Sequence, residues 1–189
     1  MSNYRDNIIT VRFDKELLKR YTGFDVEDPD SYFKAHPRAK NPPFEAIWKK
    51  SRNGLIPSIN TFLNVTDRRT QNTWEQHLRG YCEYCMQAQG IKHDYIKECL
   101  ILVINYKPTR SKADASNLYC KPFEDAMVER ELIQDDNYTI VRLHCETMVY
   151  CKDDPHSEIR IYPINDEYGL SLATLTLLTD FVSIQEGAM

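Results

Sequence analysis

Two stretches of the chain differ in their hydrophobic pattern and predict two kinds of β-strand. Cys99–Tyr106 is almost continuously apolar and is flanked by charge, as expected for a strand covered on both faces. Residues 138–150 alternate instead, which predicts a half-buried antiparallel strand. One face of that strand would carry Val141, Leu143, Cys145, Thr147 and Val149, and the other Arg142, His144 and Glu146. Lys152–Ser157 is then expected to turn, and Glu158–Tyr162 to return as the pairing partner of the alternating strand.

Helical spacing marks two further segments. Glu75 stands three residues after Asn72, the spacing of a capping box, so a helix is expected to open near Asn72 and to stop at Gly90. Four residues of this helix stand at helical spacing and would face the hydrophobic core of the protein, namely Trp74, Leu78, Tyr81 and Cys85. A second helix is predicted over Asn117–Arg130.

The first half of the chain is less regular. Asp6–Phe13 predicts a strand, and Asp14–Tyr21 predicts one or two helical turns. Residues 23–43 have no clear period and are interpreted as an irregular surface excursion, while Phe44–Lys50 is short enough for either a strand or a helical turn. The proline and asparagines of residues 55–64 argue against a regular central strand.

The order of elements predicts one α+β domain, with a mixed sheet and helices mainly on one face. The tail from Tyr168 carries apolar residues that would suit a helix docked on this core or on a second subunit, and the pattern leaves both open.

Composition narrows the class of protein. The chain has 189 residues, of which 42% are hydrophobic, and no apolar run reaches the ~20 residues of a membrane helix. The amino-terminal residues lack the apolar core of a signal peptide, so we expect a cytoplasmic protein with reduced cysteines and no membrane partner. The formal net charge is −4, which mildly disfavours nucleic-acid binding. However, eight basic and only two acidic residues lie between Lys34 and Arg69, so local charge permits it.

The candidate chemistry is concentrated between Asp114 and Asn137. Asp114 follows the continuous apolar strand, Lys121 lies on the next predicted helix, and Asp135 and Asp136 precede the alternating strand. Mg²⁺ prefers oxygen ligands, and a lysine can stabilise charge on a phosphate, so this order suits metal-dependent phosphodiester chemistry. Each part also has an ordinary structural interpretation: a helix cap, a surface pair between Lys121 and Asp125, and a polar turn.

The same residues resemble a known family. Asp114-Ala-Ser-Asn-Leu118, Lys121-Pro-Phe-Glu-Asp-Ala-Met127 and Asp135-Asp-Asn137 resemble the central motif of the RusA Holliday-junction resolvases, a phage and prophage family. Ile56-Pro-Ser-Ile-Asn60 is similar to that family's amino-terminal proline segment. The resemblance spans roughly residues 55–162. It therefore implies a RusA-like core over 55–165, preceded by a strand and an irregular extension at 1–54 and followed by a tail at 166–189.

Residue by residue, the resemblance implies a Mg²⁺ site, with Mn²⁺ as an alternative ion. Asp114 and Asp136 would be catalytic metal ligands, Lys121 the catalytic lysine, and Asp135 an auxiliary ligand. Two departures stand out: Ser116 replaces a family aspartate, and one extra residue precedes Lys121. A π-bulge or a later helix start with Pro122 in its first turn could absorb that residue. Asp125, for which a structural role is favoured, could then turn inward as a substitute ligand.

The expected function is endonucleolytic resolution of branched DNA by paired nicks, which implies a homodimer and no nucleotide cofactor. Five basic residues are expected to contact DNA: Arg68, Arg69, Lys107, Arg110 and Lys112. Two alternatives remain, a non-catalytic branched-DNA-binding protein and a metal-dependent nuclease for another DNA structure such as a flap.

The cysteine pair on the first predicted helix and one histidine are weaker candidates for a functional role. Cys82 and Cys85 have zinc-type spacing, but no second pair follows, and packing in the helix is the favoured interpretation. His144 is expected to be solvated or to face DNA.

Overall fold

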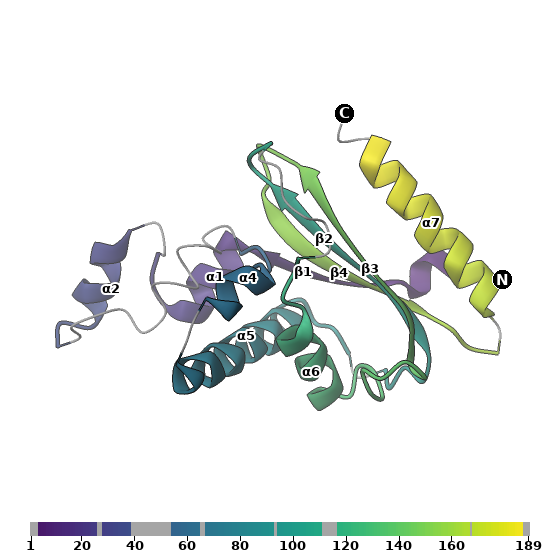
Figure 1. Cartoon of the computed structure of the whole chain (residues 1–189), viewed down its shortest axis with the longest axis horizontal. Coiled ribbons are helices and arrows are strands. Elements are labelled where there is room, and N and C mark those ends of the chain that lie inside the picture. Colours follow the sequence, from purple (N-terminus) through teal and green to yellow (C-terminus); the bar gives the residue numbers. More distant parts are fainter. Residues whose placement is uncertain are drawn as a thin grey trace.

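A computed structural model of the chain describes residues 4–25, 28–38, 54–64, 67–92, 94–110, 117–166 and 168–186. Those residues form a single α+β domain with a four-stranded mixed sheet (Figure 1). The strands are β1 (Ile9–Asp14), β2 (Cys99–Lys107), β3 (Val141–Tyr150) and β4 (His156–Pro163). The helices are η1 (Tyr4–Asn7), α1 (Lys15–Thr22), α2 (Pro29–Ala35), α4 (Ile59–Leu63), α5 (Arg68–Ala88), α6 (Lys121–Glu129) and α7 (Leu170–Glu186).

The strand order is β1-β4-β2-β3, which corrects the expected β3–β4 hairpin. β3 pairs in parallel with β2, so its predicted antiparallel pairing is wrong, and β4 pairs antiparallel with the other edge of β2. Residues 151–155 therefore cross the end of β2, where the Cys151 amide donates to the Lys107 carbonyl at 2.7 Å. Five residues can span about 17 Å, more than the roughly 10 Å between strands two places apart. A short connection therefore does not require direct pairing.

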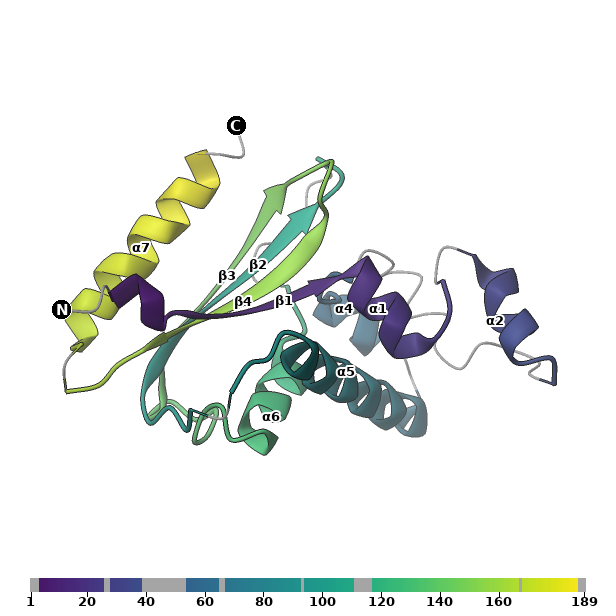
Figure 2. The same ribbon diagram turned by 180° about the vertical axis from the view of Figure 1, so that it is seen from behind.

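β2 is buried on both faces, as its continuous apolar pattern predicts. Cys99, Ile101 and Val103 pack in the core beneath α1, α5 and α6. Leu100, Leu102 and Ile104 pack in a second core with η1 and α7. Figures 1 and 2 show α5 and α6 on one side of the sheet and α7 on the other. The carboxy-terminal tail is thus a helix that closes the second face.

A β-bulge at the start of β3 changes which side chains share a face. Cys99 lies opposite Val141, but Leu100 lies opposite Leu143, so β3 contains one extra residue at this point. Val141 consequently packs with the α5–α6 core, whereas Cys145 packs with the α7 core. The prediction that Val141 shares a face with Cys145 is therefore wrong, because a bulge interrupts strict alternation.

Several helix boundaries also differ from the sequence expectation. α5 begins at Arg68 rather than near Asn72, because the Asp67 carboxylate accepts the Thr70 amide at 2.8 Å and caps the helix. It ends as expected before Gly90, whose φ of 67° is left-handed. The stretch expected to be irregular contains α2, while Phe44–Lys50 lies outside the described residues.

The extra residue before Lys121 is absorbed by a late start of α6. The helix begins at Lys121 with Pro122 in its first turn, so of the two mechanisms considered the second is the observed one. The helix is four residues shorter at its start than the sequence suggests.

Buried hydrogen bonds attach the segment before α4 to the sheet. The Asn105 side-chain amide donates to the Ile56 carbonyl at 3.0 Å, and the Ser157 hydroxyl accepts the Ile56 amide at 2.8 Å. Ser157 in turn donates to the Asn105 side-chain oxygen. All three residues are almost fully buried, so these polar groups satisfy one another without water.

We expect Asn105→Ala to lower the free energy of unfolding by about 2–4 kcal/mol, because it leaves the buried Ile56 carbonyl without a donor and the Ser157 hydroxyl proton without an acceptor. Urea denaturation would measure the change. The matched control is Asn72→Ala, at an exposed position of α5, which should change stability by no more than about 0.5 kcal/mol. Equal effects of the two substitutions would contradict the role assigned to Asn105.

Candidate functional site

The candidate site begins where two distant segments pair. Ser58 and Leu118 form an isolated antiparallel bridge. The Ile59 amide donates to the Asn117 carbonyl at 2.9 Å, and the Tyr119 amide donates to the Pro57 carbonyl at 2.8 Å. The proline segment and residues 117–119 of the central motif therefore lie side by side just before α6.

Tyr119 fixes this junction against the helices. Its ring stacks on Phe62 of α4 with centroids 4.2 Å apart, and its hydroxyl donates a hydrogen bond to Glu75 of α5. Burial and the nearby Glu75 carboxylate raise the pKa of the Tyr119 phenol, so the hydroxyl remains a donor at neutral pH. These contacts hold the residue two positions before α6 against α4 and α5.

Lys121 lies at the centre of the predicted catalytic group. Its ammonium pairs with Asp125 one turn along the helix at 2.8 Å and also with Asp136, which follows α6 in the chain. The hydrogen bonds to Asp125 and Asp136 raise the pKa of Lys121. The lysine side chain remains 56% exposed, so a ligand can reach it. The structure thus joins Lys121 and Asp136 as the sequence predicted.

Asp125 is bound by cations on both oxygens. One oxygen accepts Lys121 and the other accepts Arg79 of α5 at 2.8 Å, while Arg79 also binds Glu129 at 2.6 Å. These ion pairs join α5 to α6, which fits the structural role that the sequence favours for Asp125. They also mean that a metal ion would have to displace a bound cation to use this carboxylate.

Asp135 instead stabilises its own turn. Its carboxylate accepts the Asp136 amide and the Asn137 side-chain amide, both at 2.7 Å. The hydrogen bonds from Asn137 and from the Asp136 amide lower the pKa of Asp135. The turn in this way holds Asp136 toward Lys121, and Asp135 is in place as a turn residue.

Three predicted residues lie outside the described part of the chain, namely Asp114, Ser116 and Lys112. The remaining basic residues are at two places. Arg68 and Arg69 are exposed at the start of α5, whereas Lys107 ends β2 and the Arg110 guanidinium lies 4.7 Å from the centre of the Tyr150 ring. The start of α5 and the end of β2 lie apart in both views (Figures 1 and 2).

A second group of ligand-type side chains was missed by sequence reasoning. Cys120, His144 and Glu146 place one potential metal-ligand atom each within 4.8 Å of one another. His144 binds Glu124 of α6 at 2.9 Å, a contact that the sequence did not predict. The residue itself is exposed, as expected for a solvated histidine. His144 and Glu146 are two residues apart on one predicted strand, so the sequence indicated that they share a face. Nothing in the sequence placed Cys120 beside them.

Burial, aided by Glu146 and Glu124, raises the pKa of the Cys120 thiol. Burial alone would lower the pKa of His144, but the hydrogen bond to Glu124 and the negative charges of Glu124 and Glu146 together outweigh burial, and the pKa is raised. By contrast, Cys82 and Cys85 are fully buried in the core, as the packing interpretation predicted.

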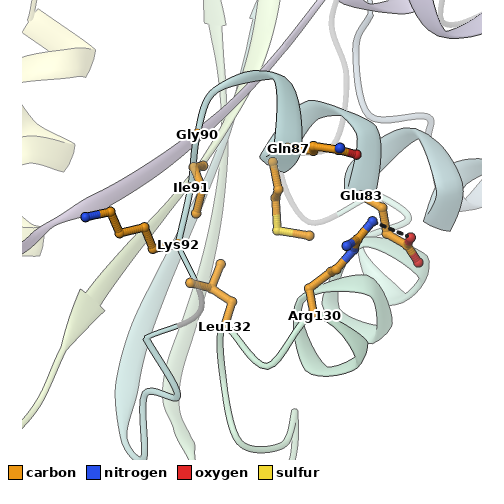
Figure 3. A pocket seen from close by; sticks show the side chains of 8 residues that line it. Glu83, Gln87, Gly90, Ile91, Lys92, Arg130 and Leu132 are labelled. Atoms are coloured by element: carbon orange, nitrogen blue, oxygen red, sulfur yellow. Dashed lines mark ion pairs between the residues drawn. The ribbon is translucent and has the colours of Figure 1, made fainter.

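A surface pocket lies elsewhere, between the end of α5 and the residues that follow α6 (Figure 3). Glu83 and Arg130 form an ion pair at 3.2 Å at its rim. None of Lys121, Asp125 and Asp136 lines it, so it is separate from the predicted catalytic group.

No protein-family model matches the chain, and no curated protein is significantly similar to it. None of the described helices is long and apolar enough to cross a membrane. The RusA resemblance therefore depends on the motif residues themselves, and it stays a prediction.

We expect the pKa of Lys121 to fall in the Asp136→Asn variant, because one of its two carboxylate partners loses its charge. It should remain above its ordinary value, because Asp125 still binds it. NMR titration of the lysine side chains would measure both. Since the folded-state pKa is raised, this ion-pair stabilisation is fully present below the ordinary lysine pKa and is lost as pH rises through the folded value. An unchanged pKa in the variant would show that Asp136 does not contact Lys121 in solution.

Proposed function

We propose that the chain is a Mg²⁺-dependent endodeoxyribonuclease that resolves branched DNA, with four-way junctions as its substrate. The observation that carries this proposal is the meeting of three separate motif segments at the start of α6. Residues 57–59 pair with residues 117–119, and Asp136 reaches Lys121 across the length of α6. These are the segments whose sequences resemble the RusA family.

The described donor set fits a hard divalent cation. Asp136 offers carboxylate oxygens, and two carboxylates already share one ammonium group, so negative potential is concentrated here. Asp136 would hold the ion together with Asp114, and Mn²⁺ could replace Mg²⁺. When bound, the ion supplies an activated water and neutralises charge on the phosphate.

Lys121 has a separate role in this proposal. Its ammonium can leave a carboxylate and donate to a non-bridging phosphate oxygen, which stabilises the negative charge that develops during hydrolysis. Its raised pKa keeps it protonated at neutral pH. The turn held by Asp135 and the ion pairs of Arg79 keep the two carboxylates in place while Lys121 moves.

Binding without cleavage is the second candidate. The observation that favours it is the engagement of both Asp125 oxygens by Arg79 and Lys121, which leaves no ready substitute for the aspartate that Ser116 replaces. In either case Arg68, Arg69, Lys107, Arg110 and Lys112 would contact phosphates, and affinity would fall steeply with salt. All six cysteines are free thiols, which suits the cytoplasm we propose as the site of action.

Labelled four-way junction, flap and linear duplex, each with Mg²⁺ or EDTA, would separate these candidates. Paired Mg²⁺-dependent nicks confined to the junction support the proposal. Cutting of the flap alone supports a nuclease for another structure, and binding without cutting supports the second candidate.

In the same assay, Asp136→Asn should lower the nicking rate by at least about 100-fold, because the ion loses an anionic ligand. Junction affinity should be retained, since no positive charge is removed. The matched control is Asp166→Asn, an exposed aspartate remote in sequence from the motif, which should cut like the wild type. Unchanged nicking by Asp136→Asn would exclude Asp136 from the mechanism.

Two symmetric nicks imply a homodimer, and the outer face of α7 supports this part of the proposal. Five large apolar residues of the helix are exposed there: Leu170, Leu172, Leu175, Leu178 and Val182. The opposite face of α7 is already buried against the sheet, so a second copy is the partner we propose for the outer one.

Leu175→Glu should convert the dimer to a monomer, because it places a charge among apolar residues and weakens association by at least about 100-fold. Sedimentation velocity would measure the change. Leu63→Glu on α4 is the control, since Leu63 is 62% exposed and Leu175 is 63% exposed. A wild-type monomer, or a dimer that survives Leu175→Glu, would contradict this interface.

A further inference from the structure

Cys120, His144 and Glu146 lie where α6 begins against β3, on the face of the sheet that α6 covers. The Cys120 sulfur is 3.8 Å from Glu146 Oε1, and His144 Nε2 is 3.9 Å from the same oxygen. A tetrahedral zinc ion separates sulfur, nitrogen and oxygen ligands by about 3.4–3.6 Å. These two separations therefore exceed zinc geometry by only a few tenths of an ångström, which side-chain rotation can supply.

Glu124 gives the imidazole a defined orientation. It binds Nδ1 of His144 at 2.9 Å, so Nε2 is the nitrogen that faces Glu146. A carboxylate on the far nitrogen is the usual support of a metal-bound histidine, because it fixes the ring and increases its basicity. Glu146 is itself held in place, since its other oxygen accepts the Leu118 amide at 3.2 Å.

The charge of this group is not balanced by Lys or Arg. Glu124 and Glu146 are only 15% and 19% exposed, yet among the described residues neither forms an ion pair with a lysine or arginine. Other partly buried carboxylates do, including Asp125, Asp180 and Glu158. Glu124 and Glu146 are thus two largely buried carboxylates that share one imidazole. Together they carry a net negative charge, which a bound cation would offset.

We propose that Cys120, His144 and Glu146 bind one Zn²⁺ ion, with Glu124 supporting His144 and a water completing the fourth position. Zinc fits because the set combines sulfur, nitrogen and oxygen, whereas Mg²⁺ takes oxygen ligands and would be excluded. The ion would join the start of α6 to β3. It is a separate centre from the proposed Mg²⁺ site, although Cys120 immediately precedes Lys121.

Zinc binding can be measured on the full chain without DNA. After incubation with Zn²⁺ in excess Mg²⁺ and removal of unbound metal, elemental analysis should give one zinc per chain. Co²⁺ in place of zinc should give a sulfur-to-cobalt charge-transfer band and the intense visible absorption of tetrahedral coordination. Binding of less than a tenth of an equivalent, or a cobalt spectrum without the sulfur band, would show a hydrogen-bonded cluster only.

Variants assign the ligands. Cys120→Ser should abolish the sulfur-to-cobalt band, and Glu146→Gln should weaken zinc binding at least about tenfold. Glu124→Gln does not touch the ion, so it should keep the band but lower the affinity about 10–100-fold. Circular dichroism in EDTA would confirm that each variant is folded. If Cys120→Ser does not fold, Glu124→Gln carries the test, and unchanged affinity in that variant would overturn the proposal.

Two controls match the chemistry elsewhere in the sheet. Cys145→Ser removes a cysteine of β3 that faces the α7 core. His156→Gln disrupts a second histidine–glutamate pair, in which His156 lies 3.2 Å from Glu158. Among the described residues, this pair belongs to no group of three possible metal ligands. Both should retain one zinc and the cobalt band, and loss of the band in Cys145→Ser would refute the assignment to Cys120. Asp136→Asn should bind zinc like the wild type, so failure of the nuclease proposal would leave this test intact.

Discussion

The buried hydrogen bonds among Asn105, Ser157 and Ile56 hold together the part of the molecule on which the rest depends. They attach a segment without regular structure to two inner strands of the sheet. Once residues 56–58 are fixed, their backbone becomes a template that pairs with residues 117–119. Because buried polar groups are costly when unpaired, these bonds specify one position for the segment rather than merely adding stability. The start of α6 is a consequence of that position.

At the start of α6, the consecutive residues Cys120 and Lys121 contact different sets of side chains. Neighbouring side chains on a helix are separated by about 100°, so Cys120 and Lys121 cannot face the same way. Cys120 is buried against β3 beside an imidazole and a carboxylate, while Lys121 extends outward to Asp136. The group at Cys120 combines sulfur, nitrogen and oxygen ligands, whereas the group at Lys121 and Asp136 offers only oxygen ligands, so zinc would favour the first group and Mg²⁺ the second. The proposed zinc centre would then limit the movement of α6 and, through it, the placement of Lys121.

The sequence was sufficient to predict structural features that depend on composition and on the spacing of residues close together in the chain. The continuous apolar run of β2 predicted burial on both faces, and the four-residue spacing of Lys121 and Asp125 indicated their surface pair. The approach of Asp136 to Lys121 was expected from the order of the elements and from the family resemblance rather than from spacing. Features that depend on long-range register were not predictable. The alternation of β3 does not tell whether its neighbour is β2 or β4, and the bulge at its start leaves no sequence signal. For the same reason, Cys120 could not be assigned to His144 and Glu146, because their proximity depends on where α6 meets β3.

Asp125 shows how one carboxylate constrains the interpretation of the whole site. If it were to bind a metal ion, it would have to release Lys121 or Arg79, and release of Arg79 would remove an ion pair that joins α5 to α6. Arg79 would keep Glu129, so the helices would not separate, but a partly buried charge would lose a partner. Asp136 can bind a metal ion without such a loss, because Asp135 and Asn137 hold its turn. Among the ion pairs of the described residues, its carboxylate contacts only the ammonium of Lys121. Exchange of Lys121 from Asp136 to a phosphate therefore requires no rearrangement of the fold, and this makes Asp136, rather than Asp125, the carboxylate on which the proposed metal chemistry rests.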